Sequence, residues 1–280
     1  MDQETLQMMC CPYCRGKLRK VAFGLECDAC QKEEKRFYPI KEGIAQFIEQ
    51  ESLASQDYYI QKVYNYFSYA YDFLIPTLFT LFGYSETTLR KEILDYFSLK
   101  PGAKLLEVSV GTGANIRLLK QLFPNIDIHG IDLSPGMLVK CQRNLKKWGE
   151  SARISQANGS YLPYQDNQFD AVLHVGGINS FADKERALEE MLRVVKPGGQ
   201  VVINDEGLSP QKEKQWYSRF VIKTIFGIFA SLERGETDPP MNAIPPTAQQ
   251  LQLDYIGKDY FWLIHFRKAL KETEAQDVAR

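Results

Sequence analysis

The stretch KLLEVSVGTGAN, residues 104–115, decides the fold class. Its first half is rich in leucine and valine, as expected of a strand that is buried on both faces. Two glycines, Gly111 and Gly113, then mark a turn, and residues 116–122 have the apolar spacing of a short helix. A strand, a glycine turn and a helix in this order indicate a βα unit, whose turn is a common ligand-binding position in parallel sheets.

Strands and helices continue to alternate after this stretch. The expected strands are 126–131, 153–157, 169–175 and 200–205, and the expected helices are 134–147 and 184–195. This alternation predicts right-handed crossovers and an α/β fold with a doubly wound, mainly parallel, seven-stranded sheet. Residues 251–256 and 260–266 flank a turn at Gly257-Lys258, which predicts an antiparallel hairpin that closes one edge of the sheet.

The glycine turn excludes two common classes of nucleotide site. A dinucleotide fingerprint would place its third glycine at position 116, where this chain has isoleucine, so NAD and FAD are disfavoured. No Gly-Lys-Ser/Thr follows, which argues against a phosphate-binding P-loop. The order acid–x–small–x–Gly–x–Gly, from Glu107 to Gly113, suits a ligand with an amino-acid tail: the acid can attract an ammonium group, and the glycines allow the backbone to approach closely.

This order resembles motif I of the class I S-adenosylmethionine-dependent methyltransferases, and four elements of that family occur in order over residues 103–205. The resemblance implies a Rossmann-like methyltransferase fold with S-adenosyl-L-methionine as the cofactor. It implies that Asp132, nineteen residues after Gly113, accepts both ribose hydroxyls. Ser109 stands where the family usually has glycine, so a local adjustment of the loop is expected. The implied cofactor-binding residues are Glu107, Ser109, Gly111, Gly113, Asp132, Leu133, Met137, Asn158, Gly159 and Tyr66.

The adenine end of that site follows from two further segments. Leu133 and Met137 follow the ribose-binding acid and would cover the ring. Residues 157–164, ANGSYLPY, are similar to the family's Gly-Asp-Ala-x-x-Leu-Pro-Phe. Asn158 thus occupies the position of an aspartate that usually binds the adenine amino group, and the carbonyl of its side chain can still accept that hydrogen bond.

The chain resembles most the ubiquinone-biosynthesis-like branch of this family, in which an N-terminal Tyr-Asp helix covers the cofactor. Residues 64–74, YNYFSYAYDFL, match that helix, which implies Tyr66 beside the cofactor and Tyr71 beside the reacting groups. His174 ends the fourth strand and is a candidate general base, because a neutral imidazole can take a phenolic or enolic proton. Packing at the end of the strand is the alternative for this histidine. Asp205-Glu206 is a second candidate, with a solvated loop as its alternative.

Five of the six cysteines lie in the first thirty residues, within CCPYC (10–14) and CDAC (27–30). Two Cys-x-x-Cys knuckles twelve residues apart are typical of a tetrahedral Zn²⁺ site, and four thiolates leave no open position, so the metal is expected to be structural. A redox pair and unmetallated thiols are the alternatives. The expected ligands are Cys11, Cys14, Cys27 and Cys30, with Cys10 as the spare.

Residues 10–48 resemble the Trm112-like zinc-binding family through CPYCRGKL, the second knuckle and YPIKEGI. The sequence departs from the family pattern at a charged insertion, QKEEKR, which precedes YPIKEGI. Members of that family are associated with methyltransferases as activating partners or fused modules. We therefore expect a zinc-ribbon-like domain over 1–50, a helical cofactor-covering segment over 51–100, and a methyltransferase domain over 101–280 with a lid insertion at about 208–246.

Composition narrows the function further. The net charge of −1 over 280 residues disfavours general nucleic-acid binding. No apolar run reaches the length of a membrane span, and MDQETLQMM lacks the regions of a signal peptide, so a cytoplasmic protein is expected. The aromatic segment 216–232 would form an apolar lid, which predicts methyl transfer to a small hydrophobic or aromatic acceptor.

Three other interpretations stay open at this point, as does the oligomeric state. The first is an rRNA or tRNA methyltransferase that docks RNA through the zinc module. The second is a non-catalytic adaptor that binds the cofactor and a protein partner. The third concerns the helix expected at 216–232, which would lie on a membrane surface or contact lipid.

Overall fold

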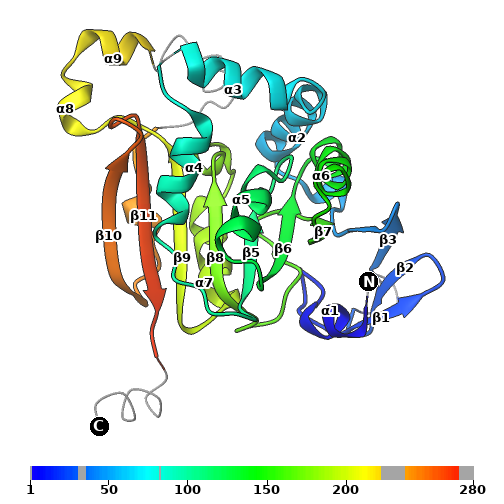
Figure 1. Ribbon diagram of the computed structural model, residues 1–280. Coiled ribbons are helices and arrows are strands. Elements are labelled where there is room, and N and C mark those ends of the chain that lie inside the picture. Colours follow the sequence, from blue (N-terminus) through cyan, green and yellow to red (C-terminus); the bar gives the residue numbers. More distant parts are fainter. Residues whose placement is uncertain (1, 31–35, 82, 222–236, 271–280) are drawn as a thin grey trace.

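The computed structural model describes residues 2–30, 36–81, 83–221 and 237–270. Seven strands form its main sheet in the order β7-β6-β5-β8-β9-β11-β10 (Figure 1). Their bounds are β5 Lys104–Val108, β6 Asp127–Asp132, β7 Arg153–Gln156, β8 Phe169–Val175, β9 Val195–Glu206, β10 Ala248–Ile256 and β11 Phe261–Lys268. The first five strands run parallel, and β11 pairs antiparallel with both β9 and β10. The predicted doubly wound sheet and its closing hairpin are confirmed.

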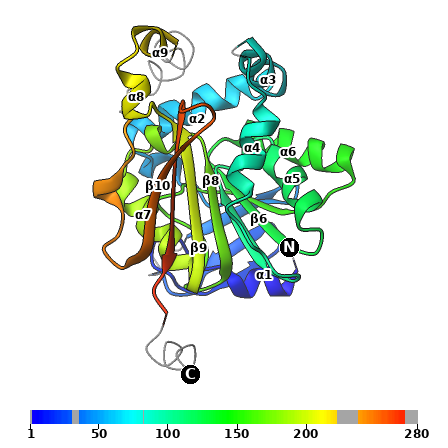
Figure 2. The ribbon, with the colours of Figure 1, turned by 60° about the vertical axis from the view of Figure 1, so that its left-hand side comes forward.

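Helices cover both faces of this sheet, with α4, α5 and α6 on one face and α7 on the other (Figure 2). Their bounds are α4 Glu86–Leu94, α5 Ala114–Leu122, α6 Pro135–Trp148 and α7 Lys184–Val194. Neighbouring residues of β5 point to opposite faces: Leu105 packs in the cluster that contains α4 to α6, and Leu106 packs in the cluster that contains α7. Both faces of the strand are thus buried, which explains its continuous apolar sequence.

One predicted turn has a different form. Residues 196–199, KPGG, lie inside β9, where the register against β8 shifts between Phe169↔Val195 and Ala171↔Gln200. Gly198 has φ +72° within this irregular segment. The expected turn is therefore an irregularity within β9, and the strand continues to pair on both sides of it. Glycine makes this possible because it adopts the left-handed backbone conformation without strain.

The N-terminal segment contributes a small ribbon, here called the zinc module and defined as residues 2–30 and 36–47. It consists of α1 (Gln3–Met8), β1 (Leu18–Val21), β2 (Gly24–Cys27), β3 (Phe37–Lys41) and β4 (Ile44–Gln46). Strand β4 pairs in parallel with β7 through Ala45↔Ser155 and Gln46↔Gln156. The small sheet therefore continues the main sheet across its edge, which sequence patterns did not predict.

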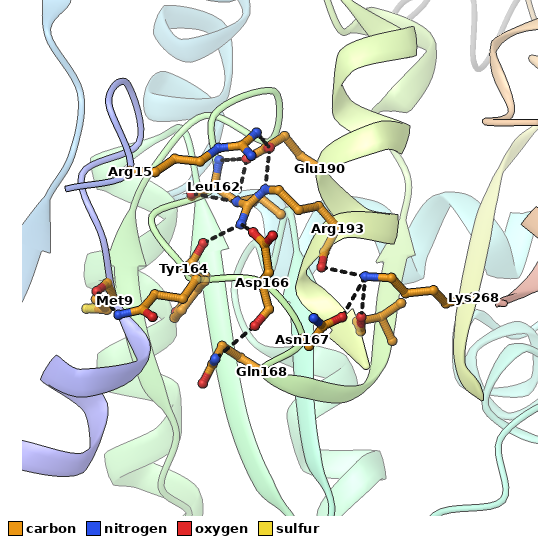
Figure 3. A network of polar contacts seen from close by, with 12 residues as sticks. Met9, Arg15, Leu162, Tyr164, Asp166, Asn167, Gln168, Glu190, Arg193 and Lys268 are labelled. Carbon is orange, nitrogen blue, oxygen red and sulfur yellow. Dashed lines mark hydrogen bonds and ion pairs between the residues drawn. The ribbon is translucent and has the colours of Figure 1, made fainter. Parts of the chain in front are cut away.

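A polar network fixes the zinc module against α7 and against residues 162–166, which precede β8 (Figure 3). The Arg15 guanidinium contacts the Glu190 carboxylate at 3.1 Å, and Arg193 donates to the same carboxylate at 2.6 and 2.8 Å. Arg193 also donates to the Tyr164 carbonyl at 2.7 Å. Lys268, on the last strand, donates to the Arg193 carbonyl at 2.9 Å. Glu190 is buried and both arginines balance its charge, so the loss of both would leave a buried charge without a cationic partner.

Two helices from the segment between the zinc module and the sheet lie over the carboxyl ends of the parallel strands in both views. They are α2 (Ser55–Phe67) and α3 (Tyr71–Leu81). The short helices α8 (Pro210–Glu213) and α9 (Trp216–Val221) lie at the same end. Of the expected lid at about 208–246, residues 222–236 are outside the described residues, as is most of the expected 216–232 helix. Among the described helices, none combines the length and apolarity that a membrane span requires.

Short 3-10 turns complete the described chain: η2 (Gln50–Ser52), η3 (Ile178–Ser180) and η5 (Met241–Ala243). The η3 turn directly follows β8 and lies beside α2. The strand order reverses at β5, whose neighbours β6 and β8 diverge on either side. Ligands of doubly wound sheets bind at this reversal, beyond the carboxyl ends of the strands.

Candidate functional site

A cavity lies at this reversal of strand order, beneath α2 and α3. Its apolar lining comes mainly from the covering helices and from the strand ends. The apolar residues are Ile60, Ile75, Leu78, Phe79, Leu89, Ile131, Leu133, Met137, Ala157, Val175, Phe181 and Phe261. The ionisable and amide side chains in the lining are Asp57, Gln61, Tyr64, Tyr71, Glu86, Arg90, Asp132, Asn158, Asn204, Asp205 and Glu206.

Asp132, at the end of β6, is held by two backbone N–H groups. Gly111 donates to one carboxylate oxygen and Ser134 to the other, each at 2.8 Å. Burial raises the pKa of Asp132 to about 6, although hydrogen bonds from Ser134, Gly111 and Leu133 act in the opposite direction. The carboxylate is therefore mainly ionised at pH 7 and faces the cavity with a fixed orientation. This geometry suits acceptance of hydrogen bonds from a diol.

The loop after β5 leaves space above its first glycine. A Cβ atom built at Gly111 would meet no heavy atom within 4 Å, and its φ is +54°. Gly113 plays a different part: it has φ +85°, and a Cβ there would lie 2.8 Å from the Cys141 sulfur of α6. Gly113 does not line the cavity, so its expected ligand contact is corrected to a packing role. Gly111 is the glycine of the loop after β5 that lines the cavity.

Ser109 lines the cavity in a left-handed backbone conformation, with φ +62°. A side chain at such a position costs about 1 kcal/mol relative to glycine. We expect Ser109→Gly to raise the free energy of unfolding by about that amount in urea denaturation of the unliganded chain. Ser151→Gly, at an exposed residue without positive φ, is the control and should not stabilise. Equal effects of the two substitutions would contradict this interpretation.

Glu107, which was expected to attract an ammonium group directly or through water, lies at the end of β5 and is not among the residues that line the cavity. Its side chain is only 1% exposed. One carboxyl oxygen accepts a 2.7 Å hydrogen bond from the Asn115 amide, whereas the other has no partner among the described residues. Arg90 donates to the Asn115 carbonyl oxygen at 2.6 Å. Burial raises the pKa of Glu107 to about 8, even though Asn115 and the charge of Arg90 lower it.

This raised pKa makes the stability of the chain depend on pH. Glu107 stays protonated in the folded chain up to about pH 8, whereas in the unfolded chain it ionises near 4.5. Its contribution to the free energy of unfolding is thus fully present below about pH 4.5 and is lost as pH rises through about 8. We expect Glu107→Gln to flatten this decline, which urea denaturation at about pH 5 and about pH 8 would measure. The same difference from wild type at both pH values would contradict the buried-acid interpretation.

Leu133 and Met137, which were expected to cover an adenine ring, both line one end of the cavity. Gly159 lines it because no side chain fits there: a Cβ atom would lie 2.5 Å from the Phe181 ring. Asn158 also lines it, but its amide already has partners on both sides. Its carbonyl oxygen accepts from the Ser160 N–H, and its NH₂ donates to the Asp57 carboxylate, each at 2.9 Å.

The tyrosines of the covering helices that line the cavity are only partly the predicted ones. Tyr71 lines the cavity as expected, and burial raises its pKa. Tyr66 does not: its side chain is 81% exposed, because α2 directs it away from the cavity, and Tyr64 lines the cavity in its place. The prediction for Tyr66 is therefore wrong.

His174 is also misplaced for the role of a general base. Its ring is fully buried behind the cavity wall, and its Nδ1–H donates to the Val108 carbonyl at 3.0 Å. The ring packs against Phe181 at a centroid distance of 5.3 Å. Burial lowers the pKa of His174 to about 4. The histidine is thus a packed residue at the strand end, because it does not reach the cavity lining.

Asp205 and Glu206 lie in the cavity lining at the end of β9, not in a solvated loop. Asp205 is buried and accepts hydrogen bonds from the backbone N–H groups of Gly177, Asn179 and Glu206, at 3.1, 2.9 and 2.9 Å. It therefore holds the loop that follows β8.

Several polar residues of the cavity were missed by sequence reasoning. Arg90 is the main one: its guanidinium faces the cavity and donates to the Glu86 carboxylate at 2.5 and 2.8 Å. The others are Asp57, Gln61, Tyr64 and Glu86. All of them precede the first strand of the main sheet. The lining residues from α2 are Asp57, Ile60, Gln61 and Tyr64. Their spacing matches one face of a helix, and this periodicity was the signal that could have identified the inner face of α2.

The four predicted cysteine ligands converge in the zinc module. Their sulfur atoms all lie within 4.8 Å of one another. The distances between the sulfur atoms are 3.9 Å for Cys11–Cys30, 3.3 Å for Cys14–Cys27 and 3.4 Å for Cys14–Cys30. A tetrahedron of Zn–S bonds of about 2.3 Å would place sulfurs about 3.8 Å apart. The cluster is therefore close to the size that a tetrahedral metal site requires, and Cys10 stands outside it.

Comparison with known proteins assigns both parts of the chain. Residues 106–203 match the family model described as a methyltransferase domain, and residues 2–43 match that of Trm112p-like proteins. The demethylmenaquinone methyltransferase of Thermus thermophilus is 35% identical over 114 residues, which are 41% of this chain and 52% of that protein. A ubiquinone/menaquinone biosynthesis C-methyltransferase of Geobacter sulfurreducens is 32% identical over 168 residues, 57% of this chain and 64% of that protein.

The similarity to these relatives is partial, because the matched segment spans about half the length of the Thermus protein. Among solved structures, phosphoethanolamine N-methyltransferase 2 of Haemonchus contortus in complex with S-adenosyl-L-methionine has a TM-score of 0.58. It covers 90% of this chain and 71% of its own, at 13% sequence identity, and this similarity supports the fold alone. The chain thus carries a methyltransferase domain behind a Trm112p-like module.

Proposed function

We propose that this chain, with its methyltransferase domain, transfers a methyl group from S-adenosyl-L-methionine to a small, hydrophobic, quinone-like acceptor. The observation that carries the proposal is one continuous cavity with two unlike ends. The first end combines the Asp132 carboxylate with the open backbone of Gly111. The second end lies under α3, where Ile75, Leu78 and Phe79 provide an apolar wall. A polar nucleoside and an apolar acceptor would each meet complementary surface.

Residues of the first end fit the proposed cofactor group by group. Asp132 would accept hydrogen bonds from the ribose hydroxyls, because its oxygens are held at the cavity by Gly111 and Ser134. Arg90 would pair with the carboxylate of the amino-acid tail, since a guanidinium binds carboxylates well. Leu133 and Met137 would cover the adenine ring.

A buried acid near the tail has a further role in this proposal. The unpartnered oxygen of Glu107 is an acceptor just beneath the glycine loop, where an ammonium group would stabilise its charge directly or through water. Binding of the tail would then favour the ionised form of a carboxyl that burial keeps protonated in the unliganded chain.

The reaction requires alignment more than acid–base chemistry. When bound, the cofactor supplies a methyl group on a positively charged sulfonium. The acceptor carbon would form its bond to the methyl group as the carbon–sulfur bond broke, and sulfur would keep that electron pair and leave as a neutral thioether. The chain's task is to hold both molecules in line and exclude water.

An aromatic carbon acceptor must then lose its ring proton. The carboxylates at the end of β9 lie in the cavity lining, and Glu206 can take this proton within the site. Asp205 keeps the loop after β8 in position through its hydrogen bonds from the Gly177 and Asn179 N–H groups. His174 has no part in the transfer, because it does not line the cavity.

We also propose that the cysteine cluster of the zinc module holds a structural Zn²⁺. Four thiolates of matching separation favour zinc, and they leave no open coordination position for chemistry. The curated relatives are named for methyl transfer to demethylmenaquinone or in ubiquinone/menaquinone biosynthesis, which favours a quinone-like acceptor over RNA docking, an adaptor role or membrane contact.

The test of this function uses tritiated S-adenosyl-L-methionine and a reduced, prenylated naphthoquinone without the ring methyl group. We expect label to enter the organic phase with wild-type chain and to be lost with Asp132→Asn. Parallel reactions offer total tRNA and rRNA. Label in RNA but not in the quinol would contradict the proposed acceptor, and label in neither would support the adaptor alternative.

A further inference from the structure

Asp57 brings a carboxylate to the adenine end of the cavity from outside the methyltransferase domain. It lies in the first turn of α2, its side chain is 8% exposed, and it lines the cavity. One carboxylate oxygen accepts from the Ala182 N–H at 3.1 Å, and the other accepts from the Asn158 NH₂ at 2.9 Å. Two donors use only part of the capacity of a carboxylate, which can accept about four hydrogen bonds.

Asn158 is poorly placed to accept a hydrogen bond from a ligand by itself. Its carbonyl oxygen is turned toward the Ser160 N–H, and its NH₂ group, which only donates, is turned toward Asp57. The Asn158 amide thus orients the Asp57 carboxylate through this hydrogen bond. The charged acceptor beside Asn158 is therefore the Asp57 carboxylate, whereas the Asp132 carboxylate is held by the Gly111 and Ser134 N–H groups.

The position of Asp57 is fixed by its own helix. The Gln56 amide donates to the Ser180 carbonyl at 2.9 Å, and the Gln61 amide donates to the Leu133 carbonyl at 3.1 Å. These contacts join the start of α2 to both walls of the adenine end, since Leu133 and Ser180 also line the cavity. A carboxylate held from both sides has little freedom to lose on binding, which favours selective recognition.

We propose that Asp57 accepts the hydrogen bond of the exocyclic amino group of adenine and so selects an adenine nucleoside. The proposal rests on the proposed function, because it assumes that an adenosine occupies this cavity. The amino group is a donor, which a carboxylate complements. A purine with a carbonyl at the same position would bring an acceptor against an acceptor, and such a mismatch at a buried polar site is strongly disfavoured.

The experiment compares two ligands by calorimetry: adenosylhomocysteine and its deaminated analogue, inosylhomocysteine. We expect wild-type chain to prefer the adenine ligand by about 100-fold. Asp57→Asn, which is isosteric and can present donors, should reduce this preference to about 10-fold or less. Asp95→Asn makes the same change at an exposed residue outside the cavity and should leave the preference unchanged.

A swap variant keeps the test decisive if the single substitution perturbs folding. Asp57→Asn combined with Asn158→Asp exchanges the two side chains and preserves their hydrogen bond. We expect the swap to restore at least part of the adenine preference, because a carboxylate again faces the ring. Melting curves of each variant report folding independently of the ligands.

The outcomes separate this inference from the function on which it rests. Equal loss of affinity for both ligands in Asp57→Asn, with no recovery of preference in the swap, would overturn the role of Asp57 and leave the cofactor site in place. Absence of binding of either ligand to the folded wild-type chain would overturn the proposed function itself.

Discussion

Asp132→Asn is expected to weaken the binding of adenosylhomocysteine by about 100-fold. The Asp132 carboxylate is ionised near pH 7, buried, and fixed by the Gly111 and Ser134 N–H groups. Hydrogen bonds to a charged group contribute about 1.5–3 kcal/mol each, and the ribose offers two. Asparagine keeps one acceptor but turns a donor toward the glycine loop or the ligand. Equilibrium dialysis with the tritiated ligand measures the change.

The matched control lies at the other end of the same strand. Asp127 begins β6, and its carboxylate contacts Arg153 outside the cavity. We expect Asp127→Asn to change ligand affinity by less than about threefold, because its contacts with Arg153 and His129 involve no residue of the cavity lining. Similar losses in both variants would show that the Asp132 effect arises from the strand and not from the ligand contact.

Cys27→Ser is expected to have the largest effect on stability. The zinc module has only a small core of its own, and four converging thiols are its main internal constraint. Structural zinc contributes about 10 kcal/mol or more to such small modules. Loss of even half of this would lower the melting temperature by about 10 °C or more. Calorimetric melting and elemental analysis, with about one zinc per wild-type chain, measure the two effects.

The consequences of metal loss should extend to the ligand site. The Phe47 N–H donates to the Gln156 carbonyl at 2.8 Å, and the Gln156 amide donates to the Leu133 carbonyl at 3.0 Å. Leu133 lines the adenine end of the cavity, so release of β4 would loosen it. Cys10→Ser is the control: this thiol lies outside the cluster and should retain the metal. A zinc-free chain that melts at the wild-type temperature would contradict the structural role.

The doubly wound, mainly parallel class of the main sheet was accessible from sequence because its signals are local. The strand of residues 104–108, the glycines that follow and Asp132 after the next strand lie within about thirty residues of one another. Their spacing alone implies the βαβ order. The pairing of Ala45 with Ser155 could not be predicted in the same way. It joins segments more than a hundred residues apart, and the three-residue strand that makes it has no periodicity of its own.

The residues of the candidate site also differ in how far sequence could predict them. Asp132, Gly111, Leu133, Met137 and Asn158 lie in the cavity as predicted, because each follows a strand whose carboxyl end must face it. Residues from α2, α3 and α4 depend on how these helices turn toward the sheet. The aromatic segment contains several tyrosines that could equally contact a ligand by their chemistry. Only packing distinguishes Tyr64 and Tyr71, which line the cavity, from the exposed Tyr66.

His174 shows the limit of assigning chemistry by strand position. The last residues of a parallel strand alternate between its two faces, so a shift of one residue decides between the cavity and the interior. Val175 lines the cavity, and His174 is buried against Phe181. A histidine whose pKa is lowered to about 4 by burial can look like a functional residue in sequence and still serve only packing.

An isothermal titration of metal-loaded wild-type chain with adenosylhomocysteine near pH 7 tests the proposed cofactor site most directly. We expect saturable heat with about one ligand per chain and a dissociation constant in the micromolar range or tighter. A folded, zinc-containing chain that released no heat with this ligand, and that retained no tritiated S-adenosyl-L-methionine on dialysis, would contradict the proposed site.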